Sequence, residues 1–149
     1  MSVSQSSTIT YGGHHLVANR AIDGNMETKS HTKCAWNTDL WYKMDFDDVY
    51  CLSEVVIFQS HTESWNAYRM QDTKVFTVNS NTGVESLCGI LKVREDWTLE
   101  GQTYRIPCNS CGDGIKLTLR HSRSDYDHDG CIHMKEIKAL KRGQCIFNS

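Results

Sequence analysis

Proline, long apolar runs and excess charge of either sign are scarce in this sequence. Proline occurs once, at position 107, and no stretch of about eighteen apolar residues exists, so we expect no membrane-spanning helix. The formal net charge is -2 and no basic stripe is present, which argues against nucleic acid as a partner. Because the first residues are polar, we expect no intact signal peptide and interpret Met1 as the start of a mature form.

Enzyme motifs are missing as well. The chain contains no Gly-x-Ser-x-Gly, no phosphate-binding loop and no His-Glu-x-x-His. Cys111 with a histidine is the one nucleophilic pair worth weighing, and no spacing selects its partner. We therefore expect that the protein is not an enzyme.

Cysteine, by contrast, is abundant, with seven residues at positions 34, 51, 88, 108, 111, 131 and 145. Cys108 and Cys111 form a single Cys-x-x-Cys with no second pair, which disfavours a zinc ribbon. A disulfide framework in a secreted, extracellular protein is the better interpretation. Because the count is odd, at least one thiol has no partner within the chain.

Short alternating segments recur along the 149 residues. In residues 40–46, Leu40, Tyr42, Met44 and Phe46 occupy alternate positions, as in a half-buried strand. Further strands are predicted at 54–58, 75–78, 91–94, 104–106 and 115–119, with turns at 79–83, 100–101 and 111–114. This pattern favours one all-β domain, a sandwich or jelly roll with little helix. The best helical candidate is 134–142.

A turn near the N-terminus is rich in oxygen ligands. Residues 19–25 read Asn-Arg-Ala-Ile-Asp-Gly-Asn, in which Gly24 permits positive φ. The side chains of Asp23 and Asn25 and the carbonyls of the bend offer oxygens to a hard cation. A plain Asx-turn is the alternative.

This turn, the cysteine-bearing loop after it, the aromatic pair Trp41–Tyr42 before a Lys-Met-Asp strand, and the apolar strand 54–58 together resemble the F-type lectin (fucolectin) family. The resemblance runs from about residue 3 to residue 140. It implies that residues 1–149 form a discoidin-like jelly-roll β-sandwich that binds carbohydrate and contains Ca²⁺. Glycans or glycoproteins would be the partners, and a homo-oligomer is expected because lectins need several sites for avidity.

The resemblance also implies a calcium site. Its ligands would be the carboxylates of Asp23 and Glu136, the backbone carbonyls of Arg20, Asn25 and Lys135, and a hydroxyl for which Thr32 is the nearest candidate.

A second calcium site is suggested by the residues alone. Asp125, Asp127 and Asp129, the carbonyl of Cys131 and then Glu136 match the ligand positions of a twelve-residue EF-hand loop, with glycine at the sixth position. Since Glu136 cannot easily serve both sites, the two remain alternatives, and a solvated acidic loop between two strands is a third.

The sugar site implied by the resemblance is altered in this chain. The family's histidine falls on Trp36, its first arginine on Ser60 and its second arginine on Arg69, and no adjacent cysteines occur. The residues predicted to bind sugar are Trp36, His61, Trp65, Tyr68 and Arg69, although the aromatic residues are equally suited to packing. A discoidin-like adhesion or protein-binding module without sugar binding, or a calcium-binding matrix protein that uses the EF-hand-like loop, are the alternative functions.

Disulfide pairing follows the same resemblance. It suggests the pairs Cys88–Cys108 and Cys34–Cys131. Pairing of Cys51 with Cys145 is a guess, and Cys111 would then be left over.

Overall fold

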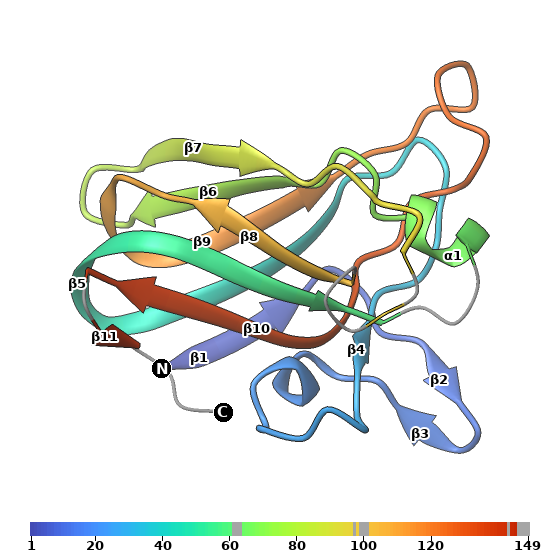
Figure 1. The fold of residues 1–149 in the computed structure, drawn as a ribbon, viewed down its shortest axis with the longest axis horizontal. Helices are drawn as coiled ribbons and strands as arrows, with labels where there is room; N and C mark the ends of the chain where they lie inside the picture. Colours follow the sequence, from blue (N-terminus) through green and yellow to red (C-terminus); the bar gives the residue numbers. More distant parts are fainter. Residues whose placement is uncertain (61–63, 97, 99–101, 143, 146–149) are drawn as a thin grey trace.

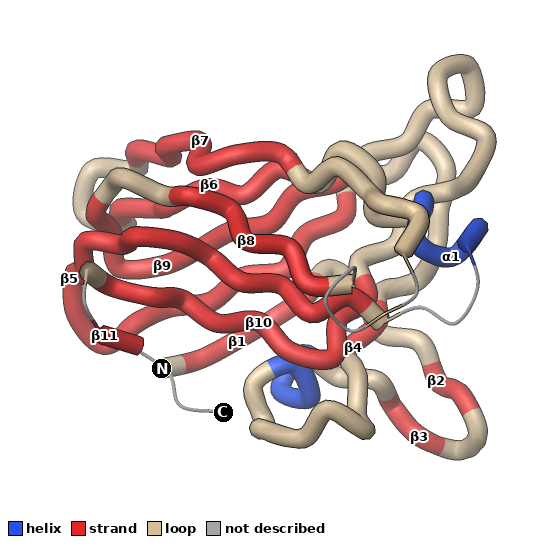
Figure 2. The backbone as a smooth tube through the Cα atoms, in the orientation of Figure 1, coloured by secondary structure: helices blue, strands red, loops and turns tan. Residues whose placement is uncertain are grey.

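The computed structural model describes residues 1–60, 64–96, 98, 102–142 and 144–145, with the side chains of 64, 65, 144 and 145 not described. Within these residues, nine antiparallel strands form a two-layered sandwich, and a separate two-stranded hairpin lies beside it (Figures 1 and 2). In this described part of the chain, helix is limited to one 3-10 turn, η1 (Ala18–Ala21), and one short helix, α1 (Ser64–Tyr68). The predicted all-β, discoidin-like sandwich with little helix is confirmed.

A single strand, β5 (Leu40–Gln59), belongs to both layers. Its first part pairs with β1 (Ser2–Gln5) and β9 (Cys111–Leu119), and its second part pairs with β8 (Thr103–Pro107) and β10 (His133–Lys141). The register against β9 shifts between Asp45 and Tyr50, which is where the strand passes from one layer to the other. The predicted strands 40–46 and 54–58 are thus two halves of one element.

The remaining strands extend the two layers. In the first, β6 (Lys74–Asn79) pairs with β9, and β7 (Val84–Ile90) follows β6 through the predicted turn at 79–83. In the second, β4 (Ser30–His31) and β11 (Gln144–Cys145) pair with β10. The hairpin consists of β2 (Thr10–Tyr11) and β3 (His14–His15).

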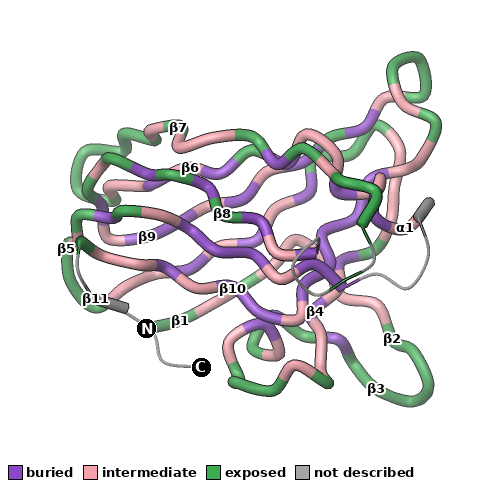
Figure 3. Tube along the Cα trace, viewed as in Figure 1, coloured by how far each residue is buried: buried purple, intermediate pink, exposed green. Residues whose placement is uncertain are grey.

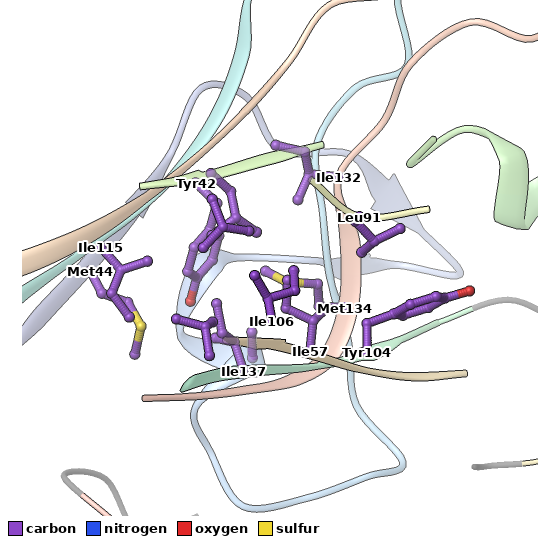
Figure 4. Packing of buried hydrophobic residues seen from close by; sticks show 14 of the residues in the cluster. Tyr42, Met44, Ile57, Leu91, Tyr104, Ile106, Ile115, Ile132, Met134 and Ile137 are labelled. Carbon is purple, nitrogen blue, oxygen red and sulfur yellow. The ribbon is translucent and has the colours of Figure 1, made fainter. Parts of the chain in front are cut away.

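The core lies between the layers, as the buried segments in Figure 3 show. Alternation places Leu40, Tyr42 and Met44 inward from β5, where each is at most 3% exposed. Figure 4 shows Tyr42 and Met44 beside Ile115 of the same layer and facing residues of the opposite layer, namely Ile57, Ile106, Met134 and Ile137. Burial of this apolar surface is the main driving force for the fold.

The prediction of a helix at 134–142 is wrong, because the segment forms β10. Its register against β5 shifts between Met134 and Glu136, so Lys135 is an extra residue that forms a bulge. The bulge turns both Met134 and Ile137 into the core at a spacing of three. That spacing imitates the period of a helix.

Two other local predictions are also wrong. Residues 91–94 are not a strand, since β7 ends at Ile90. Residues 111–114 are not a turn but the start of β9. Their glycines allow close contact between strands: a Cβ on Gly112 would lie 2.4 Å from the Val78 carbonyl oxygen, and one on Gly114 would lie 2.6 Å from that of Met44.

Three disulfides join described residues. Cys34–Cys131 and Cys88–Cys108 form as the resemblance implied. The guess for Cys51 is wrong, because Cys51 pairs with Cys111, which lies directly opposite in the β5–β9 register. Cys111 is therefore not the leftover cysteine. Cys145 lies in β11. Among the described helices, none has the length and apolar character needed to cross a membrane.

Candidate functional site

The bend after η1 is held by a residue from the far end of the chain. The backbone N–H of Gly24, which has a φ of 75°, donates to Glu136 Oε1 at 2.9 Å. Asp23 accepts at Oδ1 from the Asn25 N–H at 2.9 Å, and its Oδ2 accepts from the Thr28 hydroxyl. The predicted bend and the predicted glutamate are therefore brought together.

Glu136 is placed there by the bulge in β10, which turns its side chain to the outer face of the second layer, beneath the bend. The residue is 1% exposed, and no group of the described residues donates a hydrogen bond to its Oε2 atom. Burial, reinforced by the neighbouring Asp23, raises the pKa of Glu136 to about 7. A buried carboxylate oxygen that accepts no hydrogen bond is costly, and coordination to a cation would remove that cost.

The other oxygens of the bend suit a hard cation too. Burial opposes ionisation of Asp23, but hydrogen bonds from Thr28 and Asn25 outweigh it and lower the pKa of this carboxyl. The Thr28 hydroxyl lies 3.0 Å from the Asn25 carbonyl oxygen and 3.5 Å from that of Arg20. Carboxylate, carbonyl and hydroxyl oxygens form the donor set that Ca²⁺ prefers, so these residues fit the ion.

Two further predicted ligands have different placements. Lys135 lines a small cleft of about 270 Å³ together with Arg20 and Thr28. Thr32 is fully buried, and its hydroxyl accepts from the Ile132 N–H at 3.0 Å. The hydroxyl that the structure brings to Asp23 is that of Thr28, which was missed because it lies six residues before Cys34.

The residues of the EF-hand-like alternative have other partners in this structure. Glu136, its twelfth position, accepts from the Gly24 N–H. Asp125 accepts from the Ser122 hydroxyl at 2.8 Å, while Asp129 forms an ion pair with Arg69. Within the described residues, three or more His, Cys, Asp or Glu ligand atoms converge only at His31, Cys34 and Cys131, and there the two sulfurs are bonded to each other.

A second candidate site lies at the end of the sandwich that carries α1 (Figure 1). Two buried side chains fix α1 against the strands: Gln59 donates to the Ala67 carbonyl at 2.9 Å, and His133 Nε2 lies 3.0 Å from the Asn66 carbonyl oxygen. The turn after α1 presents Tyr68 and Arg69. The exposed loop between β9 and β10 projects beside it (Figures 1 and 3).

Between this turn and the β9–β10 loop is an open cleft of about 430 Å³, which we call the loop-end cleft. It is lined by aromatic and acidic residues: Tyr68, Gln71, Asp72, Glu95, Asp125, Tyr126, Asp127 and His128.

The walls of the loop-end cleft are fixed by side-chain contacts. The Tyr68 hydroxyl donates to Glu95 at 2.7 Å, which raises the pKa of this tyrosine, and its ring stacks with His128 at 6.2 Å between centroids. The Tyr126 hydroxyl donates to Asp72 at 2.7 Å, which raises the pKa of Tyr126 to about 12. Tyr126 also stacks on the buried His121 at 3.9 Å.

The predicted sugar-binding residues are only partly brought together. Tyr68 lines the cleft, but Arg69 turns away, with Nε 3.1 Å from Asp129 Oδ1 and one terminal nitrogen 3.5 Å from Cys34 Sγ. Trp36 lies under the guanidinium of Arg123, at 5.2 Å. His61 and the side chain of Trp65 lie outside the described residues. Tyr126 and His128 were missed, because they are interleaved with the aspartates that suggested an EF-hand.

Comparisons with known proteins agree with this fold. No family model and no curated protein matches the sequence. Solved structures do match, including an F-lectin (fucolectin) from striped bass serum (TM-score 0.70, 17% identity), covered over 99% of this chain and 46% of that chain. This chain thus spans about half of the bass protein.

Two smaller structures are matched over nearly their full length. The lectin domain of lectinolysin, complexed with Lewis B antigen, has a TM-score of 0.72 at 17% identity, with 95% of this chain and 93% of that chain covered. A family 32 carbohydrate-binding module from Clostridium perfringens, in complex with galactose, has a TM-score of 0.66 at 19% identity, with 93% and 91% covered. The chain therefore has the discoidin-like fold shared by F-type lectins and carbohydrate-binding modules.

Proposed function

We propose that the protein is a secreted, calcium-containing lectin that binds glycans, without catalysis, in the loop-end cleft. The observation that carries this proposal is the cleft itself, which joins two tyrosine rings to four carboxylates on loops fixed by a rigid sandwich. Matches to a lectin domain bound to Lewis B antigen and to a module bound to galactose support the sugar class.

The cleft has the chemistry that a sugar requires. The carboxylates of Asp72 and Glu95 accept hydrogen bonds from hydroxyl groups, and the Tyr68 and Tyr126 rings offer apolar surface to the faces of a sugar ring. Of the five residues first predicted to bind sugar, we keep Tyr68 as a contact. Arg69 acts indirectly, by holding Asp129 and with it the β9–β10 loop.

Calcium would bind at the bend and fix its loop. Asp23, Glu136, the carbonyls of Arg20, Asn25 and Lys135, and the Thr28 hydroxyl would hold the ion. When bound, it would supply positive charge against the two neighbouring carboxylates. Three disulfides among the described residues support an extracellular location.

A glycan array tests the function. The wild-type protein, displayed at high density, is compared with Tyr68→Ala and with Tyr11→Ala, which changes an exposed tyrosine on the β2–β3 hairpin as a matched control. We expect binding to at least one glycan class, reduced about tenfold or more by Tyr68→Ala, because loss of a buried aromatic contact costs on the order of 1.5–3 kcal/mol. Absence of any glycan signal for correctly folded wild-type protein favours the alternative of an adhesion or protein-binding module.

A further inference from the structure

Next to the loop-end cleft is a second groove, of about 530 Å³, on the outer face of the first layer. Asp72 and Tyr126 line both, so the two adjoin each other. The groove extends over the ends of three strands at the α1 end of the sandwich: β5 begins there, β9 ends there, and β6 begins there. Its wall includes Trp41 and three cationic side chains, Lys74, Lys116 and Arg120.

The strand register places positive charges next to one another on this face. Lys43 of β5 lies directly opposite Lys116 of β9, a pairing of like charges that destabilises a sheet. Lys74 of β6 is paired with Thr118, so it lies diagonally from Lys116. Trp41 is also paired with Thr118, from the other side, and completes the row.

Four acids lie near this charge, and one of them, Asp72 in the groove wall, is itself paired with Lys92. Lys43 has Asp45 at 3.8 Å, Lys116 has Glu85 at 3.1 Å, and Arg120 has Asp39 at 3.1 Å. Glu85 comes from the edge strand β7 and Asp39 is 85% exposed, so both reach in from the rim. In the described part of the chain, no ion pair is recorded for Lys74, which is exposed. The overall net charge is -2, so this cationic strip is a local feature.

We propose that the strip formed by Trp41, Lys43, Lys74, Lys116 and Arg120 binds the anionic substituent of an acidic glycan whose neighbouring sugar occupies the loop-end cleft. This inference rests on the proposed lectin function and specifies its substrate class. The indole of Trp41 packs against a sugar ring, while Lys74 and Lys116 donate hydrogen bonds to a sulfate or a carboxylate. A bound anion beside Lys116 also offsets the repulsion between Lys116 and Lys43.

The test uses matched glycans that share one backbone and are neutral, sulfated or carboxylated. Wild-type protein is compared with Lys74→Gln, Lys116→Gln and the double variant, with Lys141→Gln on β10 as a charge-matched control. We expect the wild type to favour an acidic member about tenfold or more, because each charge-assisted hydrogen bond contributes on the order of a tenfold change. The preference should disappear in the double variant and persist in the control, and the sulfated and carboxylated arms identify the anion.

Salt supplies an independent measurement, since exposed charges are screened within about 8 Å at physiological ionic strength. Binding of the acidic member should weaken with added NaCl, while binding of the neutral member should not. Equal binding of neutral and acidic members by the wild type, or a preference that survives in the double variant, overturns the inference and leaves the lectin function standing. Acidic binding that requires the lysines but is unaffected by Tyr68→Ala also overturns the inference, because the glycan would then bind to the strip without its neighbouring sugar in the loop-end cleft.

Discussion

Glu136 Oε1 accepts a hydrogen bond of 2.9 Å from the backbone N–H of Gly24, a residue 112 positions earlier in the chain. This contact joins the last long strand to the first bend. It leaves Glu136 Oε2 buried, with no hydrogen-bond donor among the described residues, and close to a second carboxylate, that of Asp23. Without a cation, the negative charges of the Glu136 and Asp23 carboxylates are poorly compensated. Stability should therefore depend on calcium, which can be tested.

Replacing Glu136 by Gln should reverse the response to calcium. Without the metal, Glu136→Gln should be at least as stable as the wild type, because it removes a buried charge and keeps an oxygen for the Gly24 N–H. At calcium one hundred times the Kd, the wild type should gain about 2.7 kcal/mol of unfolding free energy, and the variant should gain none. Thermal melts in chelator and in calcium measure both effects.

Asp127→Ala is the matched control for that experiment, since it removes a carboxylate from the EF-hand-like loop and leaves the bend intact. It should retain the full stabilisation by calcium. Stabilisation that is lost in Asp127→Ala and kept in Glu136→Gln would show that the ion binds at the other site.

The ion pair between Arg69 and Asp129 should contribute to stability as well as to binding. The two side chains are 25% and 26% exposed, and the Arg69 carbonyl also accepts from the Cys131 N–H at 3.1 Å. A double-mutant cycle with Arg69→Ala and Asp129→Ala should give a coupling free energy of about 1 kcal/mol in chemical denaturation. A coupling near zero, together with lost glycan binding in Arg69→Ala alone, would instead make Arg69 a direct sugar contact.

Strands with one buried and one exposed face could be predicted from the sequence. Leu40, Tyr42 and Met44 alternate because every second side chain of β5 enters the core, and that period is visible without coordinates. The same reasoning gave a wrong prediction for β10, because the bulge at Lys135 places both Met134 and Ile137 in the core and breaks the alternation. A bulge depends on how the strand pairs with its partner, so it cannot be predicted from the local sequence pattern.

The candidate sites depended even more on distant contacts. The bend at Asp23 was evident from its residue types, but the choice of Thr28 over Thr32 depends on where β4 pairs with β10. Tyr126 and His128 were not predicted as cleft residues, because they lie within a segment whose spacing matches an EF-hand loop. The twelfth residue of that motif, Glu136, has its side chain at the bend, a placement that depends on the pairing of β10 and not on the loop sequence.

The disulfide between Cys51 and Cys111 gives a further prediction. Because it closes a segment with a sequence separation of 60, its removal should destabilise the protein by about 2–4 kcal/mol, mainly by freeing the unfolded chain. Cys111→Ser should show this loss in denaturant titrations, and a non-reducing digest of the wild type should contain the cross-linked peptide. Recovery of a Cys51–Cys145 peptide from native protein would contradict the structure.

Acid should weaken the attachment of α1 through His133. Burial, with a smaller contribution from the stacked His31, lowers the pKa of His133 from its ordinary 6.5 to about 3. Between these values the unfolded chain binds a proton that the folded chain does not, so stability is present above pH 6.5 and is lost as the pH falls toward 3. His133→Gln keeps a donor for the Asn66 carbonyl and cannot titrate. Its unfolding free energy should therefore fall less steeply with acid than that of the wild type, whereas His14→Gln, on the exposed hairpin, should follow the wild type. Parallel pH profiles for wild type and His133→Gln would show that this imidazole does not control acid stability.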